Sequence, residues 1–441
     1  MKAEKSIKKY DYDVAVLGAG PAGIMAAGKA ARFGASVVLI EKNFTLAKKL
    51  LLTGNGRCNF TNAEFNLSEL VKNYNNGKFL FHIFSVFGPK ETIKFFEELG
   101  VKTKIEKNKR VFPASDSAQE VLEALEKYLA ENKVNIIFNS EVINVDHSGK
   151  KINKLILKDF STGLGNGREI TAKKYILCTG GKSYPLTGSD GFGYKLAKKL
   201  GHTIVKPLPA LSSIRIKEKW VKNLQGISLK GVKITVFQKG KKRFQEEGSI
   251  LFTHFGVSGP AVLNISANVG DLLENGLSVG QAGEAKICFD LAPLLNQGEF
   301  GEKINEILKK YPKKKFKNIL SDFAPEKLAE ILLDIAGVDK NKMAGNVSKI
   351  ERGMTAKIFK NFEVTAESIF GFNEAKTTRG GISLAEIDGK TMRSKIIDNL
   401  FFAGEVIDVD GKTGGFNLQM CWSTGCVAGE SCGQESMICV T

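Results

Sequence analysis

The chain of 441 residues has few of the side chains that build metal centres and disulfide frameworks, with only seven cysteines and four histidines. Three cysteines cluster, at positions 421, 426 and 432, but C-x₄-C-x₅-C is not a zinc spacing and no histidine lies nearby. An odd number of scattered cysteines favours reduced thiols. The sequence therefore predicts neither a metal site nor a disulfide scaffold.

Long hydrophobic runs are also missing. The basic first residues lead directly into a short apolar run, without the apolar core and cleavage site of a signal peptide. Gly, Lys and Arg interrupt the later apolar stretches before they reach the length of a bilayer span. The composition, 43% hydrophobic and 25% charged, is that of a globular protein, and the length favours two or three structural units. We expect a cytoplasmic protein that does not enter the membrane.

Acidic residues are scarce in the middle of the chain, whose formal net charge is +17. Eleven Lys and Arg lie between Lys206 and Arg243, against one acid, and seven lysines lie between Glu302 and Lys317, against two glutamates. Two interpretations stay open. The lysines are either ordinary solvated side chains or a surface that attracts a polyanion such as RNA.

Residues 11–42 carry the clearest local pattern. A buried strand in "YDVAVLG", an Ala-rich helix and a second buried strand in "ASVVLIEK" make a βαβ unit. Gly18, Gly20 and Gly23 form G-x-G-x-x-G at the start of the helix, and Glu41 ends the second strand. Such glycines let a pyrophosphate approach the helix N-terminus, and the acid accepts ribose hydroxyls. The pattern predicts dinucleotide binding.

The end of the chain favours FAD over NAD. "LFFAGEV" predicts a strand that ends at Gly404 and Glu405, and "GGFNLQ" predicts a helix that starts at Gly414 and Gly415. A late helix N-terminus suits the flavin pyrimidine, which gains negative charge on reduction. "GLGNG" at 163–167 precedes a strand-like segment, so we interpret it as a hairpin turn and not as a second nucleotide motif.

Between these parts the pattern changes twice. Residues 209–290 are strand-like with Gly-rich turns, residues 299–360 are helical, and strands return from about 363. Ser117 and Glu120 have the spacing of a capping box for the helix that follows. The sequence thus predicts one α/β domain interrupted by an insertion with a β part and a helical part.

Several segments together resemble a known family, the BaiN-type (YhiN or aminoacetone-oxidase-like) bacterial FAD-binding flavoproteins. They are "DVAVLGAGPAGIMAA", "KKLLLTGNGRCNFTN", "LCTGGKSYPLTGSDGFGYKLAKKLGH", "LFTHFGVSGPAVL", "TRGGISLAEID" and "LFFAGEVIDVDGKTGGFNLQMCWSTG". The resemblance implies a Rossmann-type FAD domain of the disulfide-reductase-like class, with an inserted β-barrel-like domain and a small helical domain. The expected boundaries are 1–208 and 377–441 for the FAD domain, 209–298 and 362–376 for the β-rich domain, and 299–361 for the helical domain.

The resemblance also implies bound FAD and an oxidoreductase activity. Members of the family have been assigned reduction of unsaturated bile acids, amine oxidation and dihydrouridine synthesis in ribosomal RNA. Combined with the motifs, it gives an expected set of cofactor-binding residues: Gly18, Gly20, Pro21, Ala22, Gly23, Glu41, Lys42, Lys49, Gly54, Gly56, Arg57, Cys58, Asn59, Thr179, Gly180, Gly181, Gly404, Glu405, Gly414, Gly415, Phe416 and Asn417.

Two of these activities share one chemistry, hydride addition to the β carbon of a conjugated C=C bond and protonation of the α carbon. Such a site needs donors for an enolate-like oxyanion and a proton source. The candidate N–H donors are Arg57, Lys182 and Arg379, and the candidate proton donors are Cys58, Tyr184 and His254. Two interpretations of Cys58 stay open, a thiol whose pKa is lowered by Arg57 and a small buried thiol.

The substrate stays open at this stage. Ribosomal RNA uridine is modestly favoured, through the basic residues 206–243 and 303–317, because dispersed lysines bind a phosphate backbone. The alternatives are a small-molecule flavoenzyme, either a steroid reductase or an amine oxidase, and a non-catalytic RNA-binding protein that keeps FAD structurally. NAD(P)H is expected as a transient reductant that meets the flavin from solvent, with another electron donor as the alternative.

Overall fold

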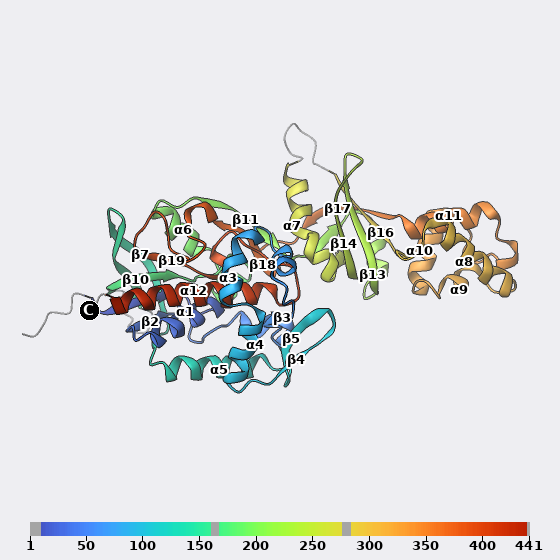
Figure 1. The fold of residues 1–441 in the computed structure, drawn as a ribbon. Coiled ribbons are helices and arrows are strands. Elements are labelled where there is room, and N and C mark those ends of the chain that lie inside the picture. The colour runs from blue at the N-terminus through green and yellow to red at the C-terminus, as the bar shows by residue number, and fades with distance from the viewer. Residues whose placement is uncertain (1–9, 160–166, 276–283, 439–441) are drawn as a thin grey trace, which may run out of the picture. The chain divides into compact units, whose positions relative to one another are not determined.

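The computed structural model describes residues 10–159, 167–275 and 284–438 (Figure 1). The chain divides into two compact units, Met1–Leu208 with Lys376–Thr441 and Pro209–Ala375. The first unit thus combines both ends of the sequence, and the second is inserted between them. The finer boundaries at 298 and 361 stay predictions.

A five-stranded parallel sheet forms the centre of the first unit. Its strand order is β19 (Leu400–Phe402), β10 (Ala172–Leu177), β1 (Tyr12–Leu17), β2 (Val37–Ile40) and β6 (Asn135–Ile137). All four residues of β2 and the last residues of β1 (Val14–Leu17) and β10 (Tyr175–Leu177) are apolar or aromatic and buried, as expected for a sheet covered on both faces. Because β10 pairs with both β1 and β19, a strand from late in the sequence lies in the same sheet as the first strand.

Two long helices, α1 (Pro21–Arg32) and α12 (Phe416–Ile438), pack against each other beside the sheet (Figure 1). Small residues allow this close approach. A Cβ on Gly425 would lie 2.4 Å from the carbonyl oxygen of Ala22, and a Cβ on Gly429 would lie 2.4 Å from that of Ala26. Gly425 and Gly429 therefore allow α12 to pack closely against α1.

The other elements of the first unit surround this centre. Three smaller sheets have the orders β3 (Thr61–Asn62), β5 (Arg110–Pro113), β4 (Thr103–Ile105); β7 (Ser140–Ser148), β8 (Lys151–Asp159), β9 (Arg168–Ile170); and β11 (Ile204–Ala210), β18 (Thr377–Ile382). The remaining helices are α2 (Leu67–Leu70), α3 (Phe81–Val86), α4 (Pro89–Glu98), α5 (Ala118–Glu131) and α6 (Phe192–Lys199). Within the described residues, no helix is long and apolar enough to cross a bilayer.

The second unit contains a closed six-stranded barrel. Its strands follow the order β12 (Ile214–Ile216), β15 (Gly256–Ser258), β14 (Lys241–Phe252), β13 (Ser228–Gln238), β16 (Ala285–Asp290) and β17 (Phe362–Ile369). Phe252, Phe289 and Phe362 contact one another inside the barrel. The helices α8 (Gln297–Lys310), α9 (Phe316–Leu320), α10 (Glu326–Ala336) and α11 (Lys349–Lys360) share one hydrophobic cluster with it. The predicted fold class, a Rossmann-type α/β domain with an inserted barrel and helices, is confirmed.

The strand-like interpretation of residues 209–290 is wrong for one segment. Residues Pro260–Asn275 form a sixteen-residue helix, α7, that packs on β14. Ala261, Ile265 and Val269 are buried at helical spacing. Gly259 and the β-branched residues hid this period, because Gly and Val are typical of turns and strands.

Two local predictions concern turns and caps. The capping box at Ser117 is wrong, because Ser117 makes no side-chain cap and Glu120 instead accepts a hydrogen bond from the hydroxyl of Ser115. Residues 163–166 of the predicted hairpin turn lie outside the described residues. The strands that flank it, β8 and β9, pair antiparallel, as a hairpin requires.

Candidate functional site

The glycines of the nucleotide loop lie where the βαβ unit turns from β1 into α1. Gly18 has a φ of +95° and donates its N–H to the carbonyl of Ile40 at 2.8 Å. A Cβ on Gly23 would lie 1.9 Å from the oxygen of Gly18, whereas a Cβ on Gly20 would meet no atom of the described chain within 4 Å. Position 20 therefore faces open space beside the free N–H groups of a helix N-terminus, as pyrophosphate binding requires.

Glu41 lies at the end of β2 and is 7% exposed. Its Oε2 accepts the N–H of Ala19 at 2.8 Å, and its Oε1 accepts the backbone and side-chain N–H groups of Asn43 at 2.8 and 2.7 Å. These bonds tie the acid to the nucleotide loop. Because a carboxylate offers about four acceptor sites, it can still accept ribose hydroxyls.

Two ion pairs join segments that lie far apart in the sequence. Lys42 pairs with Asp190 at 2.8 Å, and Lys49 pairs with Glu405 at 3.1 Å. The side chains of Lys49 and Glu405 are 21% and 13% exposed. Both pairs belong to the walls of a cleft that opens at the carboxyl ends of β1 and β2.

The cleft encloses about 960 Å³, its open mouth included. The expected cofactor-binding residues that line it are Gly18, Gly20, Pro21, Ala22, Glu41, Lys42, Lys49, Thr179, Gly180, Gly404 and Glu405. The hydroxyl oxygen of Thr179 is buried and has no hydrogen-bond partner among the described residues. The open space at Gly20 and this unpaired hydroxyl fit the predicted FAD.

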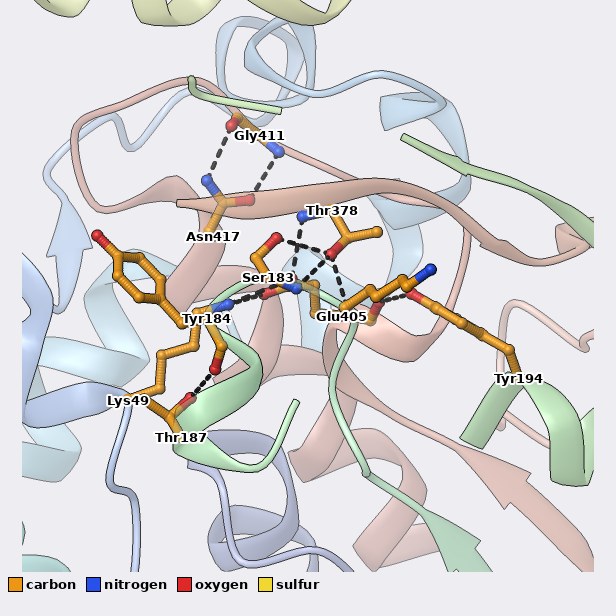
Figure 2. A network of polar contacts seen from close by, with 10 residues as sticks. Lys49, Ser183, Tyr184, Thr187, Tyr194, Thr378, Glu405, Gly411 and Asn417 are labelled. Carbon is orange, nitrogen blue, oxygen red and sulfur yellow. Dashed lines mark hydrogen bonds and ion pairs between the residues drawn. The ribbon is translucent and has the colours of Figure 1, made fainter. Parts of the chain in front are cut away.

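A polar network connects the loop after β10 with β18 and Glu405 (Figure 2). The hydroxyl oxygen of Thr378 accepts the N–H groups of Lys182 at 2.8 Å and Ser183 at 3.2 Å, and it shares a hydrogen bond of 2.8 Å with the Ser183 hydroxyl. The N–H of Thr378 donates to Oε1 of Glu405 at 3.0 Å. One threonine thus holds two walls of the site together.

The N-terminus of α12 is fixed by two asparagines. Asn417 exchanges two hydrogen bonds of 2.8 Å with the backbone of Gly411 (Figure 2). Asn59 donates to the carbonyls of Thr61 and Val111 and accepts the N–H of Gly415, each at 3.0 Å. A Cβ on Gly415 would lie 2.2 Å from the carbonyl oxygen of Thr61. The expected contacts of Gly414, Gly415, Phe416 and Asn417 with the cofactor stay predictions.

A short segment that the sequence did not single out supports the same helix start. Tyr74 donates its hydroxyl to the carbonyl of Phe416 at 2.8 Å. Asn75 donates its N–H to the carbonyl of Asp410 at 3.0 Å, and its side-chain oxygen accepts the N–H of Asp410 at 2.6 Å. Asn76 donates to the carboxylate of Asp408 at 3.1 Å. Asparagines are common in turns, so the sequence held no signal for this role.

Of the two interpretations of Cys58, the one in which Arg57 lowers the pKa of its thiol is wrong. The guanidinium of Arg57 bonds Asp116 at 2.8 Å and pairs with Glu106, and it stacks 4.1 Å from the ring of Phe112. The hydrogen bond that Arg57 donates to Glu106 holds the pKa of Glu106 below its usual range. Cys58 is fully buried, and burial raises the pKa of its thiol to about 12. It is the buried thiol of the alternative interpretation, while contact of residues 54–59 with the flavin stays a prediction.

Arg379 lies on β18 and pairs with a buried acid. Its Nε lies 3.1 Å from Oδ1 of Asp410, whose side chain is 6% exposed. The neighbouring carboxyl of Asp408 has its pKa raised to about 6, first by burial and then by the charge of Asp410. The hydrogen bonds from Gly380 and Asn76 and the charge of Arg379 lower the pKa of Asp408, but by less than these two causes raise it. The sequence named Arg379 but not the two acids that accompany it.

The two remaining candidate proton donors, Tyr184 and His254, belong to different units. Tyr184 follows Ser183 in the loop after β10, and Lys376 donates to its hydroxyl. His254 belongs to the second unit, where it is exposed and its ring centroid lies 4.9 Å from that of Phe255. Its catalytic role stays a prediction. Within the described part of the chain, no group of three or more His, Cys, Asp or Glu could hold a metal ion.

Comparisons with known proteins agree with this architecture. The family model described as HI0933-like protein Rossmann domain matches residues 12–431. The chain is 31% identical to the 3-dehydro-bile acid delta(4,6)-reductase of Clostridium scindens, over 96% of this chain and 99% of the relative. It is 30% identical to the ribosomal RNA dihydrouridine synthase of Haemophilus influenzae, over 95% and 97%. Among solved structures, a flavocytochrome c3 fumarate reductase matches with a TM-score of 0.52 and 18% identity, over 97% of this chain and 78% of that one.

Proposed function

Because the chain belongs to the HI0933-like Rossmann family and is an FAD-dependent oxidoreductase, we propose that it reduces a conjugated C=C bond of a small molecule, such as an unsaturated 3-oxo steroid. The observation that carries this proposal is the identity of 31% with a bile acid reductase over nearly the whole of both chains. The sequence-based preference for ribosomal RNA is thereby reversed.

FAD is held, in this proposal, along the cleft of the first unit. The N-terminus of α1 binds the pyrophosphate beside Gly20, and Glu41 binds the adenosine ribose. Lys49 and Glu405 close the cleft where the chain turns towards α12. The glycines before α12 then present its N-terminal dipole to the flavin pyrimidine.

Bound flavin supplies hydride when it is reduced. The protein must bind the conjugated carbonyl, stabilise its developing negative charge and supply one proton. We assign the charge stabilisation to Arg379, because Asp410 orients its guanidinium from a buried position. Tyr184 is the proton donor, since its hydroxyl belongs to the loop that Thr378 ties to Glu405.

The reductant is NAD(P)H in this proposal. In the described chain the only G-x-G-x-x-G that joins a strand to a helix is that of residues 18–23. A nicotinamide would therefore reach the flavin from solvent and leave again after hydride transfer. Anaerobic reduction by NADH or NADPH, followed through the flavin absorbance, tests this step. Reduction only by dithionite would contradict it.

A second candidate is dihydrouridine synthesis in ribosomal RNA, favoured by the basic residues of the second unit. Lys241, Lys242 and Arg243 are exposed at the start of β14, next to the turn at Lys239 and Gly240. Part of the charge at 303–317 is already neutralised, because Lys317 pairs with Glu326 and Glu330. Replacing Lys239, Lys241, Lys242 and Arg243 by glutamine should abolish RNA binding with FAD retained, if this candidate is correct.

One experiment separates the two substrates. Nucleosides of ribosomal RNA from a deletion strain are analysed by mass spectrometry, and extracts of the same strain are assayed for reduction of a 3-oxo-4,6-diene steroid. We expect unchanged dihydrouridine and lost steroid reduction. Loss of dihydrouridine that returns with the gene would overturn the small-molecule proposal.

A further inference from the structure

Tyr184 has an unusual backbone conformation for an aromatic residue. Its φ of 54° and ψ of 60° lie in the left-handed region, which side chains with a Cβ adopt only at an energetic cost. Such conformations persist only where surrounding contacts enforce them, and they concentrate at functional sites. The conformation therefore raises the question of what holds Tyr184 and for what use.

The loop around Tyr184 is held on both sides. Thr187 donates its N–H and its hydroxyl to the carbonyl of Tyr184, at 2.8 and 2.7 Å. On the other side, the backbone of Lys182 and Ser183 bonds the hydroxyl of Thr378 (Figure 2). The N–H of Thr378 bonds Glu405, which lines the cofactor cleft. The loop conformation is thus coupled to the wall of that cleft.

Lys376 contacts the side chain of Tyr184 from the same region as Thr378. Its Nζ donates a hydrogen bond to the phenol oxygen and lies 4.9 Å from the ring centroid. Lys376 immediately precedes β18, two positions before Thr378. Arg379, on β18 itself, meets Asp410. The segment at the start of β18 therefore places one cation at the phenol and a second cation at a buried acid.

A phenol that is held by an ammonium group has the chemistry of a proton donor. The ammonium stabilises the phenolate that remains after proton transfer and carries a proton that can replace the one lost. On the basis of the proposed function, we propose that Tyr184 protonates the α carbon of the substrate and that Lys376 is its positioning residue. Neither the motifs nor the comparisons with known proteins assign a role to Lys376.

The step balances without a further reactant. As hydride reaches the β carbon, the π electrons of the C=C bond move to the carbonyl as an enolate. The α carbon then forms a C–H bond with the proton of Tyr184 while the phenol O–H bond breaks. The phenolate takes a proton from the Nζ of Lys376, and Lys376 takes one from solvent.

The first test follows the proton in heavy water. Wild-type holoenzyme should place deuterium on one face of the α carbon of a 3-oxo-4,6-diene steroid. Tyr184→Phe should lower kcat by about 100-fold and Lys376→Met by about tenfold, since positioned proton transfer contributes roughly 10²–10⁴-fold. Both variants should place deuterium on both faces of the α carbon. Lys94→Met is the matched control, because Lys94 is exposed and pairs only weakly with Glu98 at 3.7 Å.

A second readout does not depend on turnover. In protein labelled with ¹³C at the hydroxyl-bearing carbon of tyrosine, the Tyr184 resonance is identified by its loss in Tyr184→Phe. It should shift in Lys376→Met and stay in place in Lys94→Met, and methylammonium should restore part of the rate of Lys376→Ala. Single-face deuteration in both variants, with wild-type turnover, would overturn the role of the pair alone. Wild-type enzyme that reduces no conjugated enone would overturn the proposed function and the pair with it.

Discussion

Lys49 and Glu405 lie 356 positions apart in the chain and form an ion pair, with Nζ 3.1 Å from the Oε2 atom. Lys49 follows β2 in the first βαβ unit, whereas Glu405 follows β19 near the end of the chain. Both side chains are largely shielded from water, so their attraction is less screened than that of a surface pair. The pair joins the two parts of the sequence that the insertion separates.

Replacing Glu405 by glutamine should weaken FAD binding by about tenfold, because a hydrogen bond to a charged group contributes roughly 1.5–3 kcal/mol. The change removes the negative charge that pairs with Lys49 and weakens the acceptor of the hydrogen bond from Thr378. Flavin fluorescence during dilution of the holoenzyme measures the affinity. Glu69→Gln is the control, since its pair with Lys72 is exposed, and equal losses in both variants would contradict the account.

Gly20 and Gly23 should respond differently to alanine. Gly20→Ala should fold with a nearly unchanged Tm but fail to bind FAD, because its Cβ enters open space that the pyrophosphate is expected to occupy. Gly23→Ala should lower the Tm as well, because its Cβ would lie 1.9 Å from the oxygen of Gly18. Thermal unfolding and flavin content of both variants check this. FAD retained in Gly20→Ala would place the pyrophosphate elsewhere.

Cys58 should resist alkylation in the native protein. Its thiol is fully buried and its pKa is raised to about 12, so the reactive thiolate is scarce and shielded at pH 8. Mass spectrometry after treatment with N-ethylmaleimide should find this residue unmodified before unfolding and modified after it. Rapid modification of Cys58 in the native protein would instead support the other interpretation, a thiol whose pKa is lowered.

Asp408 should make stability depend on pH. Its folded pKa of about 6 exceeds the ordinary value of 3.8, so the folded state binds more protons between these values and stability falls as the pH rises through them. Asp408→Asn removes this loss. Measured with saturating FAD, the Tm of Asp408→Asn minus that of the wild type should therefore be larger at pH 8 than at pH 4. A difference that is constant with pH would contradict the shift.

The sequence predicts well what local patterns determine. The nucleotide loop is visible because Gly18, Gly20 and Gly23 stand between a strand and a helix, and Glu41 follows at the end of the next strand. The strand β19 and the helix α12 are also predictable, because Gly404, Gly414 and Gly415 lie between an apolar strand and a helix. In contrast, α7 was missed, because valines, asparagines and a preceding glycine disguise its helical period.

Contacts between distant segments could not be predicted. Asp116 and Glu106 take the guanidinium of Arg57 away from Cys58, although Cys58 is its neighbour in sequence. Tyr74, Asn75 and Asn76 support the start of α12 from more than 300 positions away. No periodicity or motif indicates which residues of a loop will face one another after folding.

We propose that reduced flavin in this protein transfers hydride to a conjugated C=C bond of a small molecule. It is tested most directly by a single turnover without oxygen, in which the reduced holoenzyme is mixed with a 3-oxo-4,6-diene steroid and the flavin absorbance is followed. We predict rapid reoxidation and a steroid product heavier by two hydrogens. Flavin that stays reduced with the steroid but is reoxidised by ribosomal RNA, with dihydrouridine formed, would contradict the account.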